Sequence, residues 1–185
     1  MPGFPLDPYG FSTEDRLKWS EPSINYLVNS EDIFYLADLT FDNGEPIYNA
    51  RELSHMEDVK NLVTLMRYVL AVGMILLLIL SIVLVLMKDK SEVQKAFFRG
   101  GWAVFVLIGT ILFFVALSFN QLFTWFHQLF FSSGTWLFYT SDTLIRLFPL
   151  RFWRDAFIFV GLLSLIIAGS VIMLNRRKRK QEPDD

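Results

Sequence analysis

Three long runs without a charged residue dominate the hydropathy pattern of this chain. Residues 68–87 and 156–174 are uncharged and rich in Leu, Ile and Val, and residues 100–141 form a run about twice as long. At about 1.5 Å per residue, roughly 20 apolar residues in a helix cross a hydrocarbon core of about 30 Å. The pattern predicts transmembrane helices at residues 61–87, 101–120 and 155–175, and therefore a mainly α-helical integral membrane protein.

The second half of the longest run has a different composition from the first. It contains Asn120, Gln121, His127 and a Ser132-Ser133-Gly134 break, and it places nine aromatic residues between Phe119 and Tyr139. Aromatic and polar residues together are typical of the membrane–water interface. We therefore expect residues 121–154 to form an interfacial aromatic segment, whose rings also suit a water-poor cradle for acyl chains. A fourth span within residues 120–141 is the alternative.

The distribution of charge predicts the orientation. The linker at residues 88–100 and the tail at residues 176–185 hold most of the basic residues near the spans, whereas the first 60 residues carry twelve acidic and four basic groups. The positive-inside rule places the linker and tail in the cytoplasm, and residues 1–60 and 121–154 outside. Because residues 1–10 resemble neither a signal peptide nor a span, we expect a further transmembrane helix ahead of residue 1 in the natural protein.

Residues 1–60 have the turn and cap signals of a small extracytoplasmic α/β cap. Ser12 or Thr13 can cap a helix through Trp19, and Ser20-Glu21-Pro22 predicts a second helix start. Residues 33–41 are predicted to form a strand, followed by a hairpin turn at residues 42–44. Ser54-His55-Met56-Glu57 has the capping-box pattern and predicts that His55 lies in the first turn of the first membrane helix.

The chain contains two histidines, His55 and His127, and the predicted topology places both at the outer membrane face. Histidine suits proton transfer near neutral pH, although an interfacial histidine with a structural hydrogen bond is the simpler interpretation. A metal site formed by the histidines with Asp58 or Glu57 is a weaker alternative, because no HxxxH or HExxH spacing is present. With no cysteine, a thiolate-ligated metal and a cysteine nucleophile are excluded.

Other polar and aromatic residues near the predicted spans are candidates for supporting roles. Asp58 could orient His55, Arg67 could extend towards the interface, and Arg151 and Arg154 could bind lipid phosphate or glyceryl oxygens. Solvated or paired side chains are the plain alternative for these charges. The supporting or substrate-binding candidates are Asp58, Arg67, Trp125, Trp136, Asp142, Arg151, Trp153 and Arg154. No phosphate-binding loop, nucleophile elbow or nucleic-acid module is present, and no nucleic-acid partner is expected.

The order of several short motifs resembles that of the bacterial lipoprotein intramolecular transacylases, the Lit family. These motifs are Tyr9 to Trp19 (YGFSTEDRLKW), Ser54 to Val59 (SHMEDV), Phe126 to Phe131 (FHQLFF), Trp136, Asp142 to Ile145 (DTLI), Phe148-Pro149 and Phe152 to Asp155 (FWRD). The resemblance implies four transmembrane helices under an extracytoplasmic cap in a bacterial cytoplasmic membrane. It also implies two catalytic histidines, which correspond to His55 and His127.

The implied reaction moves the sn-2 acyl chain of a diacylglyceryl lipoprotein to the α-amine of its N-terminal cysteine, giving a lyso-form lipoprotein without a cofactor. One histidine would act as general base and the other as acid or oxyanion donor. We assign His55 as base, with Asp58 orienting it, although the sequence allows the reverse order. A non-catalytic membrane accessory protein whose cap binds a partner and a metal-dependent membrane hydrolase are the competing hypotheses.

Overall fold

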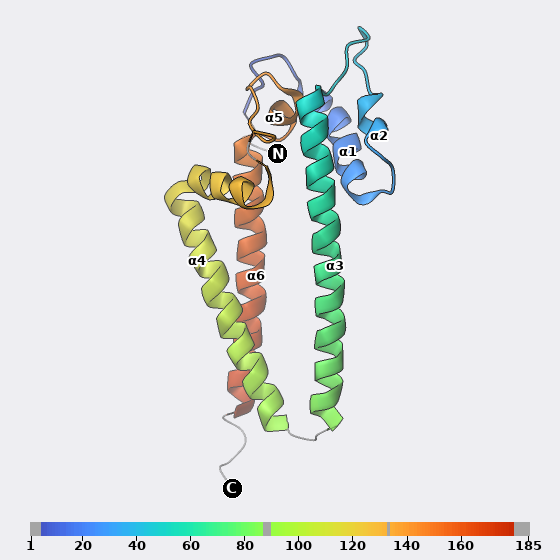
Figure 1. Ribbon diagram of the computed structural model, residues 1–185. Helices are drawn as coiled ribbons and strands as arrows, with labels where there is room; N and C mark the ends of the chain where they lie inside the picture. Colours follow the sequence, from blue (N-terminus) through green and yellow to red (C-terminus); the bar gives the residue numbers. More distant parts are fainter. Residues whose placement is uncertain (1–4, 87–89, 133, 180–185) are drawn as a thin grey trace. The chain divides into compact units, whose positions relative to one another are not determined.

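The computed structural model describes residues 5–86, 90–132 and 134–179, and helices dominate these residues. Lys88 of the predicted linker and the end of the basic tail from residue 180 lie outside the described residues. The chain divides into two compact units, which we call the site unit (residues 1–69 and 120–153) and the apolar unit (residues 70–119 and 154–185). The helices are α1 (Thr13–Val28), α2 (Phe34–Ala37), α3 (Ala50–Leu86), α4 (Lys90–Phe130), α5 (Thr143–Leu147) and α6 (Leu150–Arg179) (Figure 1).

Within the described residues, α3, α4 and α6 are long and apolar enough to cross a membrane, which confirms the prediction of three candidate membrane helices. The bounds of the spans stay a prediction. Helix α3 has 37 residues and is about 56 Å long, whereas a hydrocarbon core is about 30 Å thick. Its uncharged run is residues 68–86, and the charged residues of the helix lie in residues 50–67. Helix α4 is interrupted at Ser118, whose φ of −160° and ψ of 89° are extended, so residues 119–130 form a separate helical segment beyond the span.

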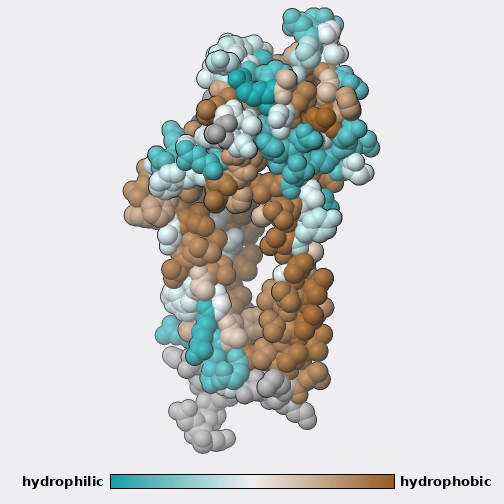
Figure 2. Space-filling model, viewed as in Figure 1, coloured by the Kyte–Doolittle hydropathy of each residue, from teal (hydrophilic) through white to brown (hydrophobic). Residues whose placement is uncertain are grey.

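The apolar unit is held by close packing of α4 against α6. A Cβ atom added at Gly161 would lie 2.6 Å from Cδ2 of Leu112, and one added at Gly101 would lie 2.9 Å from Cγ1 of Ile172. The described part of the chain buries no residue in the most apolar stretch of α3. The surface of this stretch of α3 is almost entirely hydrophobic, whereas hydrophilic residues cover much of the site unit and some of the lower end of the apolar unit (Figure 2). A helix surface this apolar is suited to lipid.

The site unit has a hydrophobic core of its own. This core joins residues of the predicted cap with the short helix α5, which comes from the predicted aromatic segment. Its buried members are Tyr26, Leu36, Ile47, Tyr48, Met56, Leu144 and Leu147. Residues 50–60 and residues 143–147 therefore pack into one body, although more than 80 residues separate them in the sequence.

The α/β prediction for the cap is wrong for the described residues, which contain no strand. Residues 34–37 form the short helix α2, and one isolated bridge joins Thr40 to Pro46. The predicted turn does form, with Gly44 at φ 83° and the Phe41 N–H bonded to the Glu45 carbonyl at 2.8 Å. The Ile47 N–H also bonds to the Leu39 carbonyl at 3.0 Å, and these two bonds flank the Thr40–Pro46 bridge. In the described residues the pairing is confined to this bridge and forms no strand.

Two of the predicted helix starts are also wrong. Pro22 lies inside α1, which is capped by Ser12 as predicted but continues to Val28. The first membrane helix begins at Ala50, because Asn49 and Glu52 form an earlier reciprocal cap: Asn49 Oδ1 accepts the Glu52 N–H and Glu52 Oε2 accepts the Asn49 N–H. His55 consequently lies in the second turn of α3.

Candidate functional site

The structure brings the two histidines together in the site unit. Their ring centroids are 6.0 Å apart and the ring planes differ by 20°. His55 is 8% exposed and His127 is 9% exposed, so both rings are removed from water. His55 comes from the second turn of α3, and His127 comes from the last turn of α4 beyond the Ser118 interruption.

A hydrogen bond within its own helix fixes the state of His127. Its Nδ1 lies 2.8 Å from the carbonyl oxygen of Phe123, four residues earlier. A carbonyl oxygen can only accept, so Nδ1 carries the proton and the lone pair of the neutral ring is at Nε2. His127 therefore has a free basic nitrogen and an orientation held by the helix backbone. Burial lowers the pKa of His127, and the bond to Phe123 opposes this effect.

His55 has a different environment. Its Nδ1 is buried and has no hydrogen-bond partner in the described structure. Burial, together with the nearby His127, lowers the pKa of His55 to about 4, so the ring is neutral at pH 7. Asp58, the predicted orienting partner, is half-buried and does not bond to this nitrogen, so that pairing is not present.

Aromatic side chains surround the two imidazoles. Phe131 and Phe138 meet the His55 ring edge-on, at centroid distances of 5.0 and 5.2 Å. Trp136 packs at 5.0 Å and Phe123 at 4.1 Å from the His127 ring. The indole nitrogen of Trp136 is buried and has no hydrogen-bond partner. The site thus combines apolar walls with polar nitrogens that a bound substrate would be able to engage.

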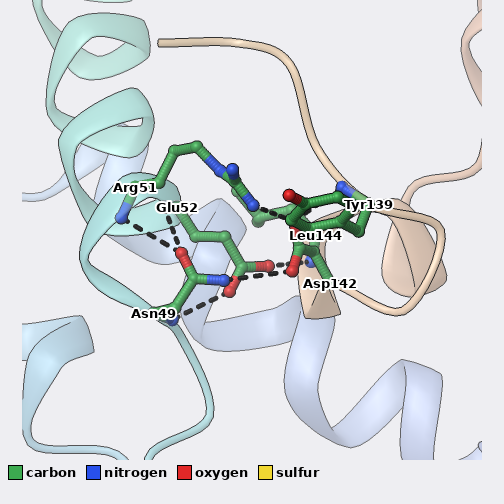
Figure 3. Close-up of polar contacts among 6 residues, drawn as sticks. All are labelled: Asn49, Arg51, Glu52, Tyr139, Asp142 and Leu144. Carbon is green, nitrogen blue, oxygen red and sulfur yellow. Dashed lines mark hydrogen bonds and ion pairs between the residues drawn. The ribbon is translucent and has the colours of Figure 1, made fainter. Parts of the chain in front are cut away.

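A polar cluster one turn before His55 joins α3 to the start of α5. Glu52 is 1% exposed, and its two oxygens accept the N–H groups of Asn49 at 2.8 Å and Leu144 at 2.7 Å. Asp142 accepts from Arg51 at 2.7 Å and from the Tyr139 N–H at 2.8 Å (Figure 3). Burial raises the pKa of Glu52 and the two backbone donors oppose this effect. The cluster fixes residues 139–144 against the helix that carries His55.

The remaining predicted supporting residues lie in several places. Trp136 contacts His127, and Asp142 belongs to the polar cluster. Arg67 donates to the Val28 carbonyl at 3.4 Å, Trp125 is exposed, and Trp153 packs on Phe148 and Phe152. Arg151 is exposed, and Arg154, in the apolar unit, contacts Asp155 at 3.4 Å. In the described residues, no hydrogen bond or ring contact joins Arg67, Trp125 or Trp153 to either histidine.

Sequence reasoning missed Arg51, Glu52 and Phe138. The Asn49-x-x-Glu52 pattern was a usable signal, because it is a capping box that precedes the one at Ser54. Nothing in the sequence indicated that Phe138 would lie on His55, since this contact joins residues far apart in the chain. In the described residues, no group of three His, Cys, Asp or Glu side chains is close enough to hold a metal ion.

The fold and the site define a class: a helical integral membrane protein with two neutral histidines packed among aromatic rings. The family model "Lipoprotein intramolecular transacylase Lit" matches residues 6–153. The chain therefore belongs to the Lit family.

The proteins similar to this chain include one relative in sequence and one solved structure. An uncharacterized protein of Aquifex aeolicus (strain VF5) is 27% identical over 169 residues, which are 91% of this chain and 75% of that protein. The in meso structure of the membrane integral lipoprotein intramolecular transacylase Lit from Bacillus cereus has a similar fold. Its TM-score is 0.65 at 21% identity, covering 92% of this chain and 77% of that one.

Proposed function

We propose that this protein moves the sn-2 acyl chain of a diacylglyceryl lipoprotein to the α-amine of the lipidated N-terminal cysteine. The observation that carries the proposal is the pair of buried, neutral histidines, 6.0 Å apart between ring centroids, among aromatic side chains of a Lit family member. An amine that attacks an ester needs a base for its proton and a donor for the oxygen that leaves. Two neutral imidazoles are able to supply both.

His127 is the better candidate for the general base, which reverses the order that we assigned from the sequence. Its Nδ1 proton is bonded to the Phe123 carbonyl, so Nε2 is available to accept the proton of the attacking amine. The amine nitrogen bonds to the acyl carbon, and the ester C–O bond then breaks. The proton taken from the amine passes to the glyceryl oxygen, so the products are an amide and a glyceryl hydroxyl.

His55 is assigned as the hydrogen-bond donor to the oxyanion or to the departing glyceryl oxygen. Its pKa of about 4 makes it a weak base, and its Nδ1 has no protein partner that would compete with the substrate. A donor that is already oriented and removed from water stabilises developing negative charge more than the same donor in solvent.

The aromatic walls address a second requirement, which is the folding of the substrate. The amine, cysteine and glyceryl atoms must close a medium-sized ring before the acyl group can transfer. Ordering of this kind supplies up to about 7–11 kcal/mol in favourable intramolecular reactions. Phe123, Phe131, Trp136 and Phe138 present faces and edges on which the acyl chains and glyceryl group would pack.

The test is tandem mass spectrometry of a lipoprotein N-terminal peptide from a host that lacks other N-acylating enzymes. We expect the N-acyl, S-monoacylglyceryl peptide with the wild-type chain. With H55A or H127A the rate should be roughly 10²–10⁴-fold lower, the usual range for loss of one proton-transfer group. Ser54→Ala and Gln128→Ala are matched controls, because each alters an exposed neighbour of one histidine. Full activity of either histidine variant would refute its catalytic role.

We further propose that residues 1–60 face the outside and that the C-terminus lies in the cytoplasm. Support comes from the twelve acidic residues of the first 60 and from the basic residues of the linker and tail. Because the chain has no cysteine, single cysteines are clean probes of this topology. A cysteine at exposed Glu45 should react with an impermeant maleimide in intact cells, and one at Glu92 should react only after lysis.

A further inference from the structure

One wall of the histidine site lies on a segment that has no regular secondary structure. Residues 136–142 lie between α4 and α5, directly before α5, and carry both Trp136, against His127, and Phe138, against His55. A loop has no helical ladder to hold its side chains in place. The position of this wall therefore depends on how the loop is tethered.

The tether is a cluster of three charged side chains, Arg51, Glu52 and Asp142, which we call the latch (Figure 3). Asp142 binds the Arg51 guanidinium at 2.7 Å and the Tyr139 N–H at 2.8 Å, while Glu52 holds the Leu144 N–H at 2.7 Å. The guanidinium also lies over the rings of Phe138 and Tyr139, with its carbon 5.7 and 4.9 Å from their centroids.

The latch and the site share one helix face. Arg51 and His55 are four residues apart on α3, so their side chains are neighbours along the helix. Phe138 lies near both of them, with its ring centroid 5.7 Å from the guanidinium carbon and 5.2 Å from the imidazole centroid. The latch therefore acts on His55 through Phe138 and does not contact the imidazoles itself.

Water competes with the amine for the same chemistry. A base beside an ester also activates water: the water oxygen bonds to the acyl carbon, the ester C–O bond breaks, and a free fatty acid leaves. One water proton passes through the base to the glyceryl oxygen, and the cysteine amine keeps its protons. A site with two histidines and free access to water would thus be an esterase, and exclusion of water determines which product forms.

We infer that the latch holds the Trp136–Phe138 wall closed against water and so makes this site a transferase in place of a hydrolase. This inference rests on the proposed function and adds positioning roles for Arg51, Glu52 and Asp142. It concerns the ratio of two products, which is separate from the rate at which either forms. Loss of the latch opens the wall, admits water and diverts acyl groups to fatty acid.

The experiment uses the full chain in proteoliposomes with a diacylglyceryl lipopeptide. Transacylation leaves the lipopeptide mass unchanged and is recognised by tandem fragmentation, whereas hydrolysis lowers the intact mass by one acyl chain. We expect Arg51→Gln to raise the ratio of hydrolysed to transacylated product about tenfold, the effect of losing one charge-assisted hydrogen bond that keeps the segment closed. Arg51→Lys, which keeps the charge but loses the planar fork, should give an intermediate ratio.

The matched control is Arg146→Gln. Arg146 forms another ion pair between distant residues of the site unit, with Asp7 at 2.9 Å, and its side chain is more buried than that of Arg51. This variant removes a comparable ion pair from α5 without touching Phe138 or Tyr139. It should lose stability and keep the wild-type product ratio. If Arg51→Gln lowers both products and leaves the ratio of hydrolysed to transacylated product equal to that of Arg146→Gln, the inference is overturned.

A second variant keeps the inference falsifiable if Arg51→Gln does not fold. Phe138→Ala removes the wall directly, leaves the latch in place, and should give the same rise in hydrolysis. An unchanged ratio with this variant would overturn the inference while leaving the transacylase proposal intact. A wild-type chain that releases only fatty acid would refute both proposals. A wild-type chain that is inert towards the lipopeptide would refute the proposed function, and with it the inference that rests on it.

Discussion

The two units satisfy their polar groups in different ways. In the site unit, hydrogen bonds join residues that are far apart in the sequence, such as Glu52 to Leu144 and Arg146 to Asp7. In the apolar unit, polar side chains bond to carbonyls four residues earlier in their own helix: Ser81, Thr110, Ser164, Ser170 and Asn175. A lipid-facing helix must satisfy its polar groups internally, whereas a site must arrange them between elements. Substitutions that remove polar groups should therefore destabilise the site unit, and substitutions that alter packing should destabilise the apolar unit.

The largest expected effect on stability comes from acid. His55 is neutral with a pKa of about 4 in the folded protein and has a pKa of about 6.5 when unfolded. Below pH 6.5 the unfolded state binds more protons than the folded state, so stability is full above pH 6.5 and falls as the pH drops to about 4. The loss amounts to about 3 kcal/mol. Thermal unfolding in detergent at stepped pH measures it, and His55→Gln should flatten this part of the profile.

A smaller loss should follow Glu52→Gln. Both Glu52 oxygens accept backbone N–H groups, and glutamine places an NH₂ group against one of these donors. An unsatisfied buried donor costs about 1–3 kcal/mol of unfolding free energy. Glu45→Gln is the matched control, because Glu45 is exposed and accepts from the nearby Asn43 amide. Equal unfolding temperatures for the two variants would show that Glu52 does not tether α5.

The smallest expected effect tests packing in the apolar unit. Gly161→Ala forces Leu112 to move, because the new Cβ would meet its side chain at 2.6 Å, and should cost about 1 kcal/mol. Gly109→Ala adds the same methyl group where no atom lies within 4 Å. Alanine favours a helix over glycine, so this variant should be neutral or slightly more stable. If the two variants unfold at the same temperature, close helix packing is not what stabilises this unit.

The three spans were predictable because a membrane imposes a simple requirement of length and apolarity that the uncharged runs meet directly. The cap was less predictable, because its local signals compete. The stretch from Ile33 to Phe41 has strand-like composition, but its backbone bonds locally from Leu36 and Ala37 to the Ile33 carbonyl. Leu36, fully buried in the core of the site unit, stabilises this helical turn.

The candidate site was partly predictable for a similar reason. The topology placed His55 and His127 at one membrane face, and the structure puts their rings 6.0 Å apart. Their catalytic roles stay a prediction. The contacts from Phe138 to His55 and from Glu52 to Leu144 depend on how distant segments pack, which spacing along the chain does not encode.

The hydrogen bond from His127 to Phe123 has an electrostatic consequence. His127 lies in the last turn of α4, where the aligned peptide dipoles leave partial negative charge on the carbonyl groups. In the proposed reaction, protonation of Nε2 would place an imidazolium near this partial negative charge, while its Nδ1–H stays bonded to the Phe123 carbonyl one turn earlier. If His127 is the base, as proposed, the helix end would act on it as the carboxylate acts on the histidine of a serine-hydrolase triad. Such a field stabilises a cation by about 0.3–2 kcal/mol, and it is present before substrate binds.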